Sequence, residues 1–383
     1  MDISIIIYIY WKNLNKFIYY NLMIIHYLKY IVILWIIIWI YIKLTSKFWS
    51  TQPIFHYYNI YYWIFFRGII HKIIPAPDKF YRYDIKTHQK CITSEHIIFL
   101  KNNYTTDELF KYNPTIDTIL PYFSKDNTII TEYRISNKLM GLITSRKIKF
   151  IYNNISYDAY YPDNLCIHPS LRRTNITPGI ISSHMYNQRQ IKDLAISISK
   201  REGKLSRQVP IISYYTYGFN LYNLNFSFCQ KLNIAQLGIN NIREITDIIT
   251  NSKFKFKIMP IFSTFFELIK NNIVMVYAII KKNEIKALWF IRPSDSYYKE
   301  KKMIECISSI NLSLPINDFK LLSLKLLDSF KENIIKIENL SDNNLIISIL
   351  QNNKTPLFLI RMEYYYYNFI QLPLKENEAF IIC

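Results

Sequence analysis

Glycine is scarce in this sequence, with only six among 383 residues. No two of them have the spacing of the GxGxxG or GxxxxGK[ST] loops that hold phosphates in dinucleotide-binding folds and P-loop enzymes. This scarcity argues against an enzyme that hydrolyses nucleotides. Hydrophobic residues make up 50% of the chain and charged residues 20%, which excludes global disorder and fits a folded protein.

The cysteines and histidines form no recognisable metal motif. The five cysteines lie far apart, form no CxxC pair and are odd in number, which argues against a zinc cage and against a disulfide framework. The seven histidines form no HExxH pair. We therefore expect no metal, a reducing compartment and a cytoplasmic location.

Acidic residues are few, 28 against 47 lysines and arginines, so the formal net charge is +19. Such a charge can indicate a partner made of phosphates, such as nucleic acid, a membrane surface or an anionic ligand. However, the positive charges are dispersed and accompany abundant isoleucine, asparagine and tyrosine, a pattern that AT-rich codon usage produces. We therefore predict no nucleic-acid partner.

The N-terminal extension, residues 1–46, contains an unbroken apolar run over residues 31–42, between Lys29 and Lys43. As a helix this run would be about 18 Å long, and the stretch 28–44 about 26 Å, which is marginal against a hydrocarbon core of about 30 Å. No small-residue cleavage site follows the run, which disfavours a secretory signal. Three alternatives remain open: a membrane anchor through residues 28–44, a buried or amphipathic appendage, and a dispensable stretch.

From Lys47 onward, short β-rich runs alternate with helix-like runs, which is the pattern of an α/β or α+β domain. Strands are predicted over residues 128–135, 139–143, 148–157, 209–216, 273–281, 285–291, 304–311, 356–361 and 364–369. Helices are predicted over residues 105–111, 178–199, 241–251, 317–331 and 343–351. Both halves follow a similar order of hairpin, strand, long helix and strand, so we expect a duplicated unit that divides near residues 215–240.

The segment 164–189 is the most informative for chemistry. An apolar strand end leads through a polar, basic turn into a helix with Pro178 in its early turns. The first N–H groups of a helix are unpaired, so this arrangement predicts an anion site, to which Arg172 and Arg173 would add charge-assisted hydrogen bonds. The alternative is a solvated loop with two surface arginines.

The same segment places nine residues in a characteristic order: Leu165, Cys166, Ile167, His168, Leu171, Arg172, Ile176, Thr177 and Pro178. In this order and spacing they resemble the signature of the N-myristoyltransferases, the glycylpeptide N-tetradecanoyltransferases. In that family a strand ending in Leu-Cys-Val-His leads through Leu-Arg and a basic turn to an apolar residue, a small residue and proline.

Four further segments resemble motifs of this family and follow in the right order. Residues 47–53 (KFWSTQP) resemble its Phe-Trp-Asp-Thr-Gln-Pro motif, and residues 100–112 its Asn-Tyr, acidic loop and Phe-basic-Phe motif. Residues 134–143 resemble its Arg-Val and Leu-Val-Gly-Phe-Ile hairpin, and residues 364–369 (YYYYNF) its Tyr-Tyr-Leu-Tyr-Asn-Trp strand. The resemblance covers residues 47–383 in outline.

The resemblance implies an α/β (α+β) fold in which two tandem acetyltransferase-like (GNAT) halves share a saddle-shaped mixed sheet. Residues 47–220 would form the acyl-CoA-binding half and residues 221–383 the peptide-binding half. The extension of residues 1–46 would precede them in the chain. This agrees with the duplicated unit expected from the order of elements. The implied protein is a monomer.

The activity implied by the resemblance is transfer of a myristoyl (tetradecanoyl) group from myristoyl-CoA to the N-terminal glycine amine of proteins. Myristoyl-CoA is then the acyl-donor substrate, and no permanently bound cofactor is implied. The alternative is a homologue with impaired catalysis that binds acyl-CoA or peptides as a scaffold.

The resemblance also assigns roles to individual residues. The backbone N–H groups of Asn164 and Leu165 would form the oxyanion hole for the thioester carbonyl. Acyl-CoA would contact Lys47, Phe48, Trp49, Cys166, Ile167, Arg172, Arg173, Thr174, Asn175, Ile176, Thr177 and Pro178. The peptide would contact Tyr104, Asp107, Glu108, Phe110 and Tyr112. The acidic pair among these predicts a preference for a basic residue in the peptide, although carboxylates are also favoured at any helix N-terminus.

The base implied by the resemblance is the main-chain carboxylate of Cys383, whereas its thiol is expected to be idle. The apolar residues 379–382 support an inserted chain end, because free termini are usually polar and frayed. Two departures from the family pattern favour a narrow substrate set or impaired catalysis. Asp163 and Asn164 stand where the family has Asn and Phe, and residues 215–219 replace its Arg-Tyr-Trp-His run.

Overall fold

The computed structural model describes residues 3–105, 108–192, 194–205, 207–222 and 233–383. The chain forms two compact units, Met1–Gln52 and Pro53–Cys383. The boundary between the units lies inside the segment 47–53. The expected division of the remaining chain near residue 220 stays a prediction, because the strands on both sides of it belong to one sheet.

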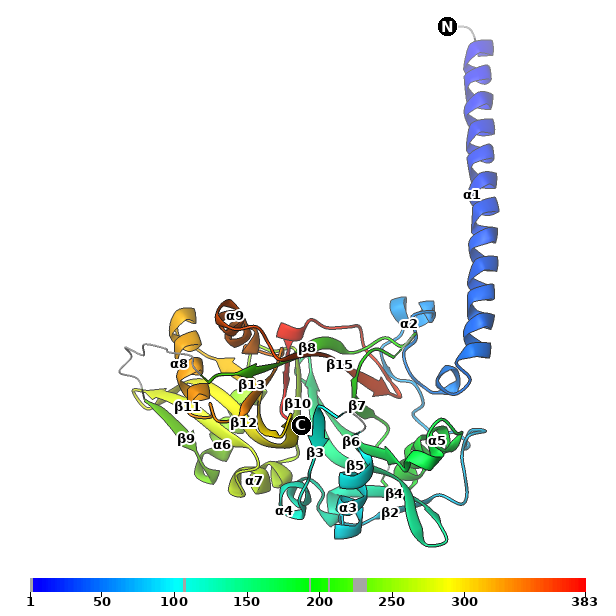
Figure 1. Ribbon diagram of the computed structural model, residues 1–383. Coiled ribbons are helices and arrows are strands. Elements are labelled where there is room, and N and C mark those ends of the chain that lie inside the picture. Colours follow the sequence, from blue (N-terminus) through cyan, green and yellow to red (C-terminus); the bar gives the residue numbers. More distant parts are fainter. Residues whose placement is uncertain (1–2, 106–107, 193, 206, 223–232) are drawn as a thin grey trace. The chain divides into compact units, whose positions relative to one another are not determined.

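The first unit consists of α1 (Ile3–Thr45) and a short 3₁₀ turn, Trp49–Thr51 (Figure 1). The helix is continuous because this segment contains neither proline nor glycine. Its stretch Ile18–Thr45 has 28 apolar-rich residues, exposed from 18 to 41 and with Ile42 buried, and a helix of that length measures about 42 Å. By length and composition, a criterion that signal sequences also meet, this stretch can cross a hydrocarbon core. The span expected over residues 28–44 lies inside this stretch, and its association with a membrane stays a prediction.

The second unit is built on a large mixed sheet. Along it the strands follow in the order β17 (Ala379–Ile381), β10 (Phe256–Pro260), β5 (Lys138–Tyr152), β6 (Ile155–Ile167), β7 (Ser197–Glu202), β15 (Phe358–Tyr367), β8 (Ile212–Asn220), β14 (Ile334–Glu338), β13 (Lys301–Asn311), β12 (Glu284–Tyr298), β11 (Met275–Lys281) and β9 (Ile234–Leu237). Three more strands attach beside this path: β2 (Lys86–Gln89), β3 (Phe110–Tyr112) and β4 (Thr128–Ile135). A separate ribbon pairs β1 (Gly68–Ile69) with β16 (Phe369–Ile370).

Two runs of elements in this unit repeat one pattern. The first run is β4, β5, β6, α5 (Ile176–Ile191) and β7, and the second is β11, β12, β13, α8 (Ile316–Asp328) and β14. In each run three antiparallel strands precede a helix, and the strand after the helix pairs parallel to the third strand. One mixed sheet carries both runs (Figure 1), which confirms the predicted fold of two tandem acetyltransferase-like halves.

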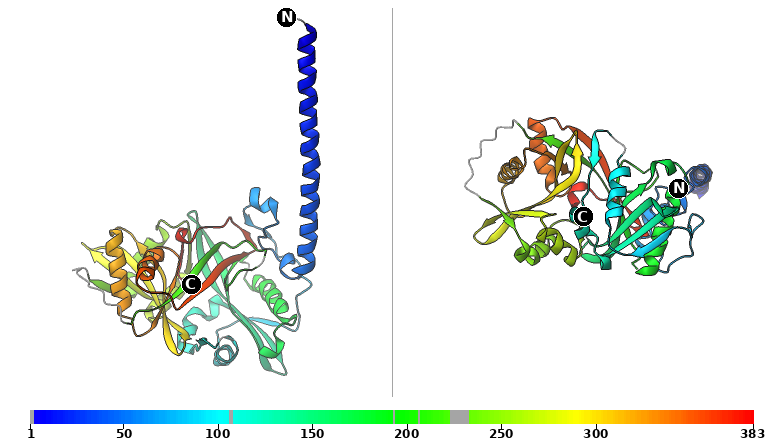
Figure 2. Two further views of the ribbon diagram at one scale, coloured as in Figure 1. Left: turned by 45° about the horizontal axis from the view of Figure 1, so that its top comes forward. Right: turned by 60° about the horizontal axis from the view of Figure 1, so that its bottom comes forward.

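Each half supplies strands to the other. β15 lies between β7 and β8, and β17 pairs parallel to β10, which pairs with β5. The C-terminus therefore lies in the middle of the unit, as both views of Figure 2 show. Along the last four residues the side chains alternate between two cores: Phe380 and Ile382 pack into one, and Ile381 and Cys383 into the other. This two-residue period buries an apolar chain end on both faces of the sheet.

The remaining helices are α2 (Ile60–Ile64), α3 (Ser94–Asn103), α4 (Ile116–Ile119), α6 (Ile242–Thr250), α7 (Phe262–Lys270) and α9 (Asn343–Asn353). The helix predicted over 105–111 is wrong, because β3 occupies Phe110–Tyr112 and pairs with β12. The helix predicted over 178–199 is too long, because α5 ends at Ile191 and Ser197 begins β7. The helices α3 and α7 were not predicted.

α5 is fixed to the sheet by a buried polar network around His184. The His184 Nδ1 lies 2.8 Å from the hydroxyl of Thr131 on β4, and its Nε2 contacts the hydroxyl of Ser145 on β5. Gln188 continues the network, because its amide donates to the Ser197 hydroxyl at 2.7 Å. Burial lowers the pKa of His184 to about 3, so the imidazole is neutral at physiological pH.

Because His184 is neutral in the folded chain, we expect the protein to lose stability in mild acid. In the unfolded chain the imidazole takes up a proton near pH 6.5, but in the folded chain only near pH 3. The contribution of neutral His184 to the free energy of unfolding is therefore complete above pH 6.5 and declines as the pH falls toward 3. Between pH 8 and pH 5 we expect the free energy of unfolding to fall by about 2 kcal/mol from this group. Urea unfolding at both pH values measures it. In His184→Gln the pH slope should flatten by that amount, and an unchanged slope would contradict the assignment.

Candidate active site

The predicted signature begins at a β-bulge in β6. Two residues of β6, Asn164 and Leu165, oppose the single residue Ile143 of β5. Asn164 has a φ of +53°, in the left-handed region that asparagine tolerates better than most residues. A bulge takes its extra residue out of the ladder and redirects its polar groups. The two residues predicted for the oxyanion hole therefore lie at a break in the β5–β6 pairing.

Asp163, expected from the sequence to disturb this site, is electrically balanced. Its carboxylate lies 2.7 Å from Nη1 of Arg146 on β5, and it also accepts the backbone N–H of Asn164 at 2.8 Å. The buried guanidinium of Arg146 lies between aromatic rings, 4.6 Å from the ring centre of Tyr161 and 5.0 Å from that of Tyr122. The pair therefore adds no net charge beside the bulge.

A cavity of about 270 Å³ opens beside the bulge. Residues from both halves line it, among them Tyr104, Tyr112, Tyr122, Arg146, Asn164 and Arg292. Its acidic groups include Asp295, which accepts a hydrogen bond from the Thr118 hydroxyl at 2.5 Å. Burial raises the pKa of this carboxyl. The cavity is thus a polar chamber with aromatic walls, between the bulge of one half and β12 of the other.

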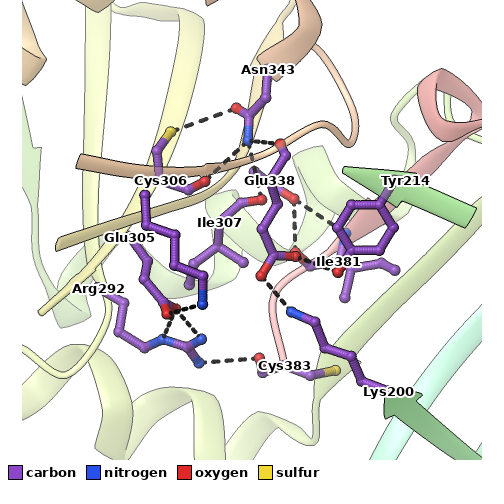
Figure 3. Close-up of polar contacts among 12 residues, drawn as sticks. Lys200, Tyr214, Arg292, Glu305, Cys306, Ile307, Glu338, Asn343, Ile381 and Cys383 are labelled. Atoms are coloured by element: carbon purple, nitrogen blue, oxygen red, sulfur yellow. Dashed lines mark hydrogen bonds and ion pairs between the residues drawn. The ribbon is translucent and has the colours of Figure 1, made fainter. Parts of the chain in front are cut away.

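The chain end is held at the same place by Arg292 of β12. Its Nη1 donates to the main-chain oxygen of Cys383 at 3.2 Å and to the Tyr122 hydroxyl at 3.3 Å. Its Nε donates to Glu305 at 3.0 Å, and Lys336 binds the other oxygen of Glu305 at 2.7 Å, as Figure 3 shows for the Arg292, Glu305 and Cys383 contacts. A buried main-chain carboxylate at Cys383 would therefore lie against a guanidinium that also lines the cavity.

The thiol of Cys383 has no comparable activation. Burial raises the pKa of this thiol to about 12, although Arg146, Lys200 and Arg292 oppose the shift. The thiol is therefore protonated at neutral pH and is a poor nucleophile. Cys166 is similar, since burial raises the pKa of its thiol to about 12.

The second half has a corresponding bulge, but a protein side chain occupies it. In β13, Ile307 is the extra residue between the pairs that flank it. The side-chain amide of Asn343, on α9, donates to the carbonyl of Ile307 at 3.2 Å and to that of Glu338 at 2.9 Å (Figure 3). Asn343 is fully buried, so the second bulge is filled from the inside. Of the two related bulges, the one at Asn164 borders the cavity.

The two arginines of the basic turn after β6 differ in their surroundings. Arg172 donates from Nε to the carbonyl of Ile167 at 3.2 Å and from Nη2 to the carbonyl of Asn103. It therefore ties β6 to the end of α3. Arg173 is exposed, with a φ of +64°. Its guanidinium is the better placed of the two to meet an anion at the start of α5.

The other residues predicted to contact acyl-CoA fall into three groups. Lys47, Phe48 and Trp49 lie in the first unit. The side chains of Cys166, Ile167 and Ile176 are buried in cores, which leaves only their backbone for a ligand. Thr174 and Asn175 precede α5, and Thr177 and Pro178 lie in its first turn.

The residues predicted to contact a peptide are only partly brought together. Tyr104 and Tyr112 line the cavity, with ring centres 5.0 Å apart. Phe110 packs instead against Tyr298 and Phe358. Glu108 is exposed, and Asp107 lies outside the described residues.

Sequence reasoning missed the two arginines that organise this site, Arg146 and Arg292. Both stand in strands whose neighbours are largely apolar, in the runs 141–151 and 287–293. An isolated charge in an apolar strand requires a buried partner, a signal that could have indicated Arg292, whereas Arg146 is followed by Lys147 and Lys149 and carries no such signal. Across the described residues, no group of three histidine, cysteine, aspartate or glutamate side chains could hold a metal ion.

Comparison with solved structures identifies the fold. Crystal structures of Saccharomyces cerevisiae N-myristoyltransferase with bound myristoyl-CoA match 86% of this chain and 89% to 94% of theirs, with TM-scores of 0.69 and 0.67. A third, with myristoyl-CoA and inhibitors, covers 88% of this chain with a TM-score of 0.67. The chain has the fold of the N-myristoyltransferases.

Sequence similarity to these enzymes is low. The identity over the N-myristoyltransferase structures is 14% to 15%. No protein-family model and no curated protein matches the sequence. The likeness therefore establishes the fold, and the chemistry has to be argued from the residues of the site.

Proposed function

We propose that this protein is an N-acyltransferase that moves a myristoyl group from myristoyl-CoA to the N-terminal glycine amine of proteins. The observation that carries the proposal is the bulge at Asn164 and Leu165, which borders a cavity built by both halves. The fold is shared with enzymes crystallised with myristoyl-CoA. The family signature occupies the same bulge and the turn after it.

The bulge would serve the acyl donor. Attack on a thioester carbonyl places negative charge on its oxygen, and fixed N–H dipoles at Asn164 and Leu165 would stabilise that charge. In the present structure the N–H of Asn164 binds the Asp163 carboxylate. The acyl donor would have to replace this contact, while Arg146 continues to neutralise Asp163.

The main-chain carboxylate of Cys383 would serve the amine. It accepts one proton from the glycine ammonium, and the freed nitrogen lone pair then forms the C–N bond to the carbonyl carbon. When the tetrahedral intermediate collapses, the C–S bond breaks and the CoA thiolate leaves. The thiolate takes up the second proton from the nitrogen, so the products are the amide, CoA thiol and one proton released to water.

Most charges around the cavity are paired. Arg146 balances Asp163, and Arg292 with Lys336 balances Glu305 and the terminal carboxylate. Asp295, whose pKa is raised by burial, is a further acidic group of the lining. In the proposed mechanism the terminal carboxylate of Cys383 takes the proton of the ammonium before attack.

We assign the remaining predicted residues to the two substrates. Arg173, Thr177 and the start of α5 would hold the CoA phosphates. Lys47, Phe48 and Trp49 are also assigned to acyl-CoA, by the resemblance alone. Tyr104 and Tyr112 would contact the peptide beside the thioester. Glu108, with Asp107, would give the preference for a basic residue further along the peptide.

Arg173→Ala tests the CoA assignment. We expect this variant to weaken myristoyl-CoA binding by about 1 to 3 kcal/mol, because a charge-assisted hydrogen bond to phosphate is lost, and by less if solvent screens it. Titration calorimetry at low and high salt measures the change. Arg243→Ala, which removes an exposed arginine on α6, is the matched control and should bind normally. Equal affinities for both variants would refute the assignment.

A scaffold without catalysis is the second candidate. It is favoured by β8, where residues 215–219 replace the family's Arg-Tyr-Trp-His run, with Gly218 near the histidine position. A Cβ at Gly218 would come within 2.1 Å of Phe358. The full-length protein, incubated with myristoyl-CoA and a glycine-starting peptide, separates the two candidates by mass spectrometry. A peptide heavier by one myristoyl group supports the transferase. Binding of myristoyl-CoA with no acylated peptide supports the scaffold, and no binding rejects both.

For α1 we propose a membrane anchor. Its stretch Ile18–Thr45 is long and apolar enough to span a bilayer, and its residues 18–41 are exposed. The full-length chain produced with lipid vesicles should stay with the lipid through an alkaline wash. Release of the chain by that wash would contradict the anchor.

A further inference from the structure

The second unit carries an exposed apolar surface at its start. Four residues on one side of α2 and its end are exposed: Ile60 (51%), Tyr61 (59%), Ile64 (62%) and Phe65 (74%). Positions four apart share one face of a helix, and the rings of Tyr61 and Phe65 are 6.0 Å apart. We call these four residues the α2 surface. Apolar side chains gathered in this way usually mark a contact site.

The opposite side of the same segment is packed into the fold. Tyr62, Trp63 and Phe66 pack against a small core of Phe55, Val209 and Ile370. The guanidinium of Arg67 closes the end of the helix, because it donates to the carbonyls of Trp63 at 2.8 Å and Phe66 at 2.6 Å. The α2 surface therefore cannot turn inward to bury its rings.

The segment that carries the α2 surface is basic. No acidic residue occurs from residue 53 to residue 77, and Arg67 and Lys72 of this segment are exposed. Lys204 is also exposed, and its Nζ lies 5.7 Å from the ring centre of Tyr57 in the same segment. Exposed aromatic and aliphatic side chains in a basic segment are the composition of protein surfaces that enter the headgroup layer of anionic membranes.

A linker of limited length joins this surface to α1. Fourteen residues separate the end of α1 at Thr45 from the start of α2 at Ile60, a distance of at most about 50 Å when extended. We propose that the α2 surface docks into the headgroup layer of an anionic bilayer, the same bilayer that α1 crosses. The inference relies on the anchor proposed for α1 and not on the acyl transfer.

The test uses the full-length chain in vesicles with and without phosphatidylserine. In a background with Cys91→Ser and Cys229→Ser, an environment-sensitive fluorophore is attached at Phe65→Cys. The matched control is Phe262→Cys, which replaces another exposed phenylalanine on α7, far from α2 in the same unit (Figure 1). With phosphatidylserine we expect at least a twofold rise in emission at position 65, quenching by spin-labelled lipid, and neither effect at position 262.

Three outcomes decide the inference. Quenching at position 65 that disappears in Lys72→Glu with Lys204→Glu supports docking through anionic headgroups. A label at position 65 that stays in water while α1 resists the alkaline wash overturns docking and leaves the anchor standing. A label shielded without lipid, in a chain that self-associates by light scattering, assigns the surface to a second copy and also overturns it.

Discussion

A chain whose Cys383 ends in an amide instead of a carboxylate is expected to acylate glycine peptides about 10² to 10⁴ times more slowly than the parent chain. The amide has nearly the same size, but it cannot accept the ammonium proton. Binding of myristoyl-CoA should be unchanged, because the site proposed for the donor is the bulge and the start of α5. Semisynthesis of the last residues provides the variant, and single-turnover kinetics with purified full-length protein measures the rate.

The control for this experiment is Cys383→Ser with a free carboxylate. In the parent chain the thiol of Cys383 is protonated and takes no part in the proposed steps. The serine variant should therefore keep most of the parent activity. Deletion of residues 381–383 is a weaker test, because these residues are buried and their loss would also disturb β17. An amidated chain that turns over at the parent rate would show that the terminal carboxylate is not the base.

Replacing Arg292 with methionine is expected to lower the free energy of unfolding by about 3 kcal/mol. The substitution leaves the buried carboxylate of Glu305 with Lys336 as its remaining ion-pair partner, and it removes the donor to Cys383. Although burial opposes the shift, Arg292 and Lys336 hold the pKa of Glu305 well below its usual range. Urea unfolding at pH 7 measures the loss.

The free energy of unfolding should also depend on Glu305 in acid. A carboxyl whose pKa is lowered by folding stabilises above its unfolded pKa of about 4.3, and this contribution is lost as pH falls below about 4. The loss should be smaller in Arg292→Met than in the parent. Arg292→Met with Glu305→Gln should recover part of the stability, whereas Lys255→Met, at an exposed ion pair, should change little. Full stability of Arg292→Met would contradict the role of this guanidinium.

Local sequence pattern was sufficient where an element's own residues decide its state. The run 128–135 became β4 within the predicted bounds, and 343–351 lies inside α9. The order of these elements already indicated a duplication, which the repeated β4 to β7 and β11 to β14 patterns confirm. Hydrophobic periodicity is a local property, and it survives in a single sequence.

The failures involve segments whose partners are distant in sequence. Residues 110–112 form β3 because Tyr112 pairs with Ser296, and a three-residue strand carries no pattern of its own. The segment after Ile191 leaves the helix because Ser197 and Ile198 pair with β15. In both places tertiary pairing overrode local propensity.

The sequence by itself determined the class of the fold, the signature at Leu165–Pro178 and the apolar character of the chain end. Motifs and the alternation of apolar and polar residues are properties of consecutive residues, so they can be recognised without knowing the tertiary contacts. Only the tertiary structure decided that Asn164 stands in a bulge, that Arg146 neutralises Asp163, and that Arg292 meets Cys383 and Glu305. These contacts join residues 13, 17 and 91 positions apart, and which charges are paired depends on how the strands are placed in the sheet.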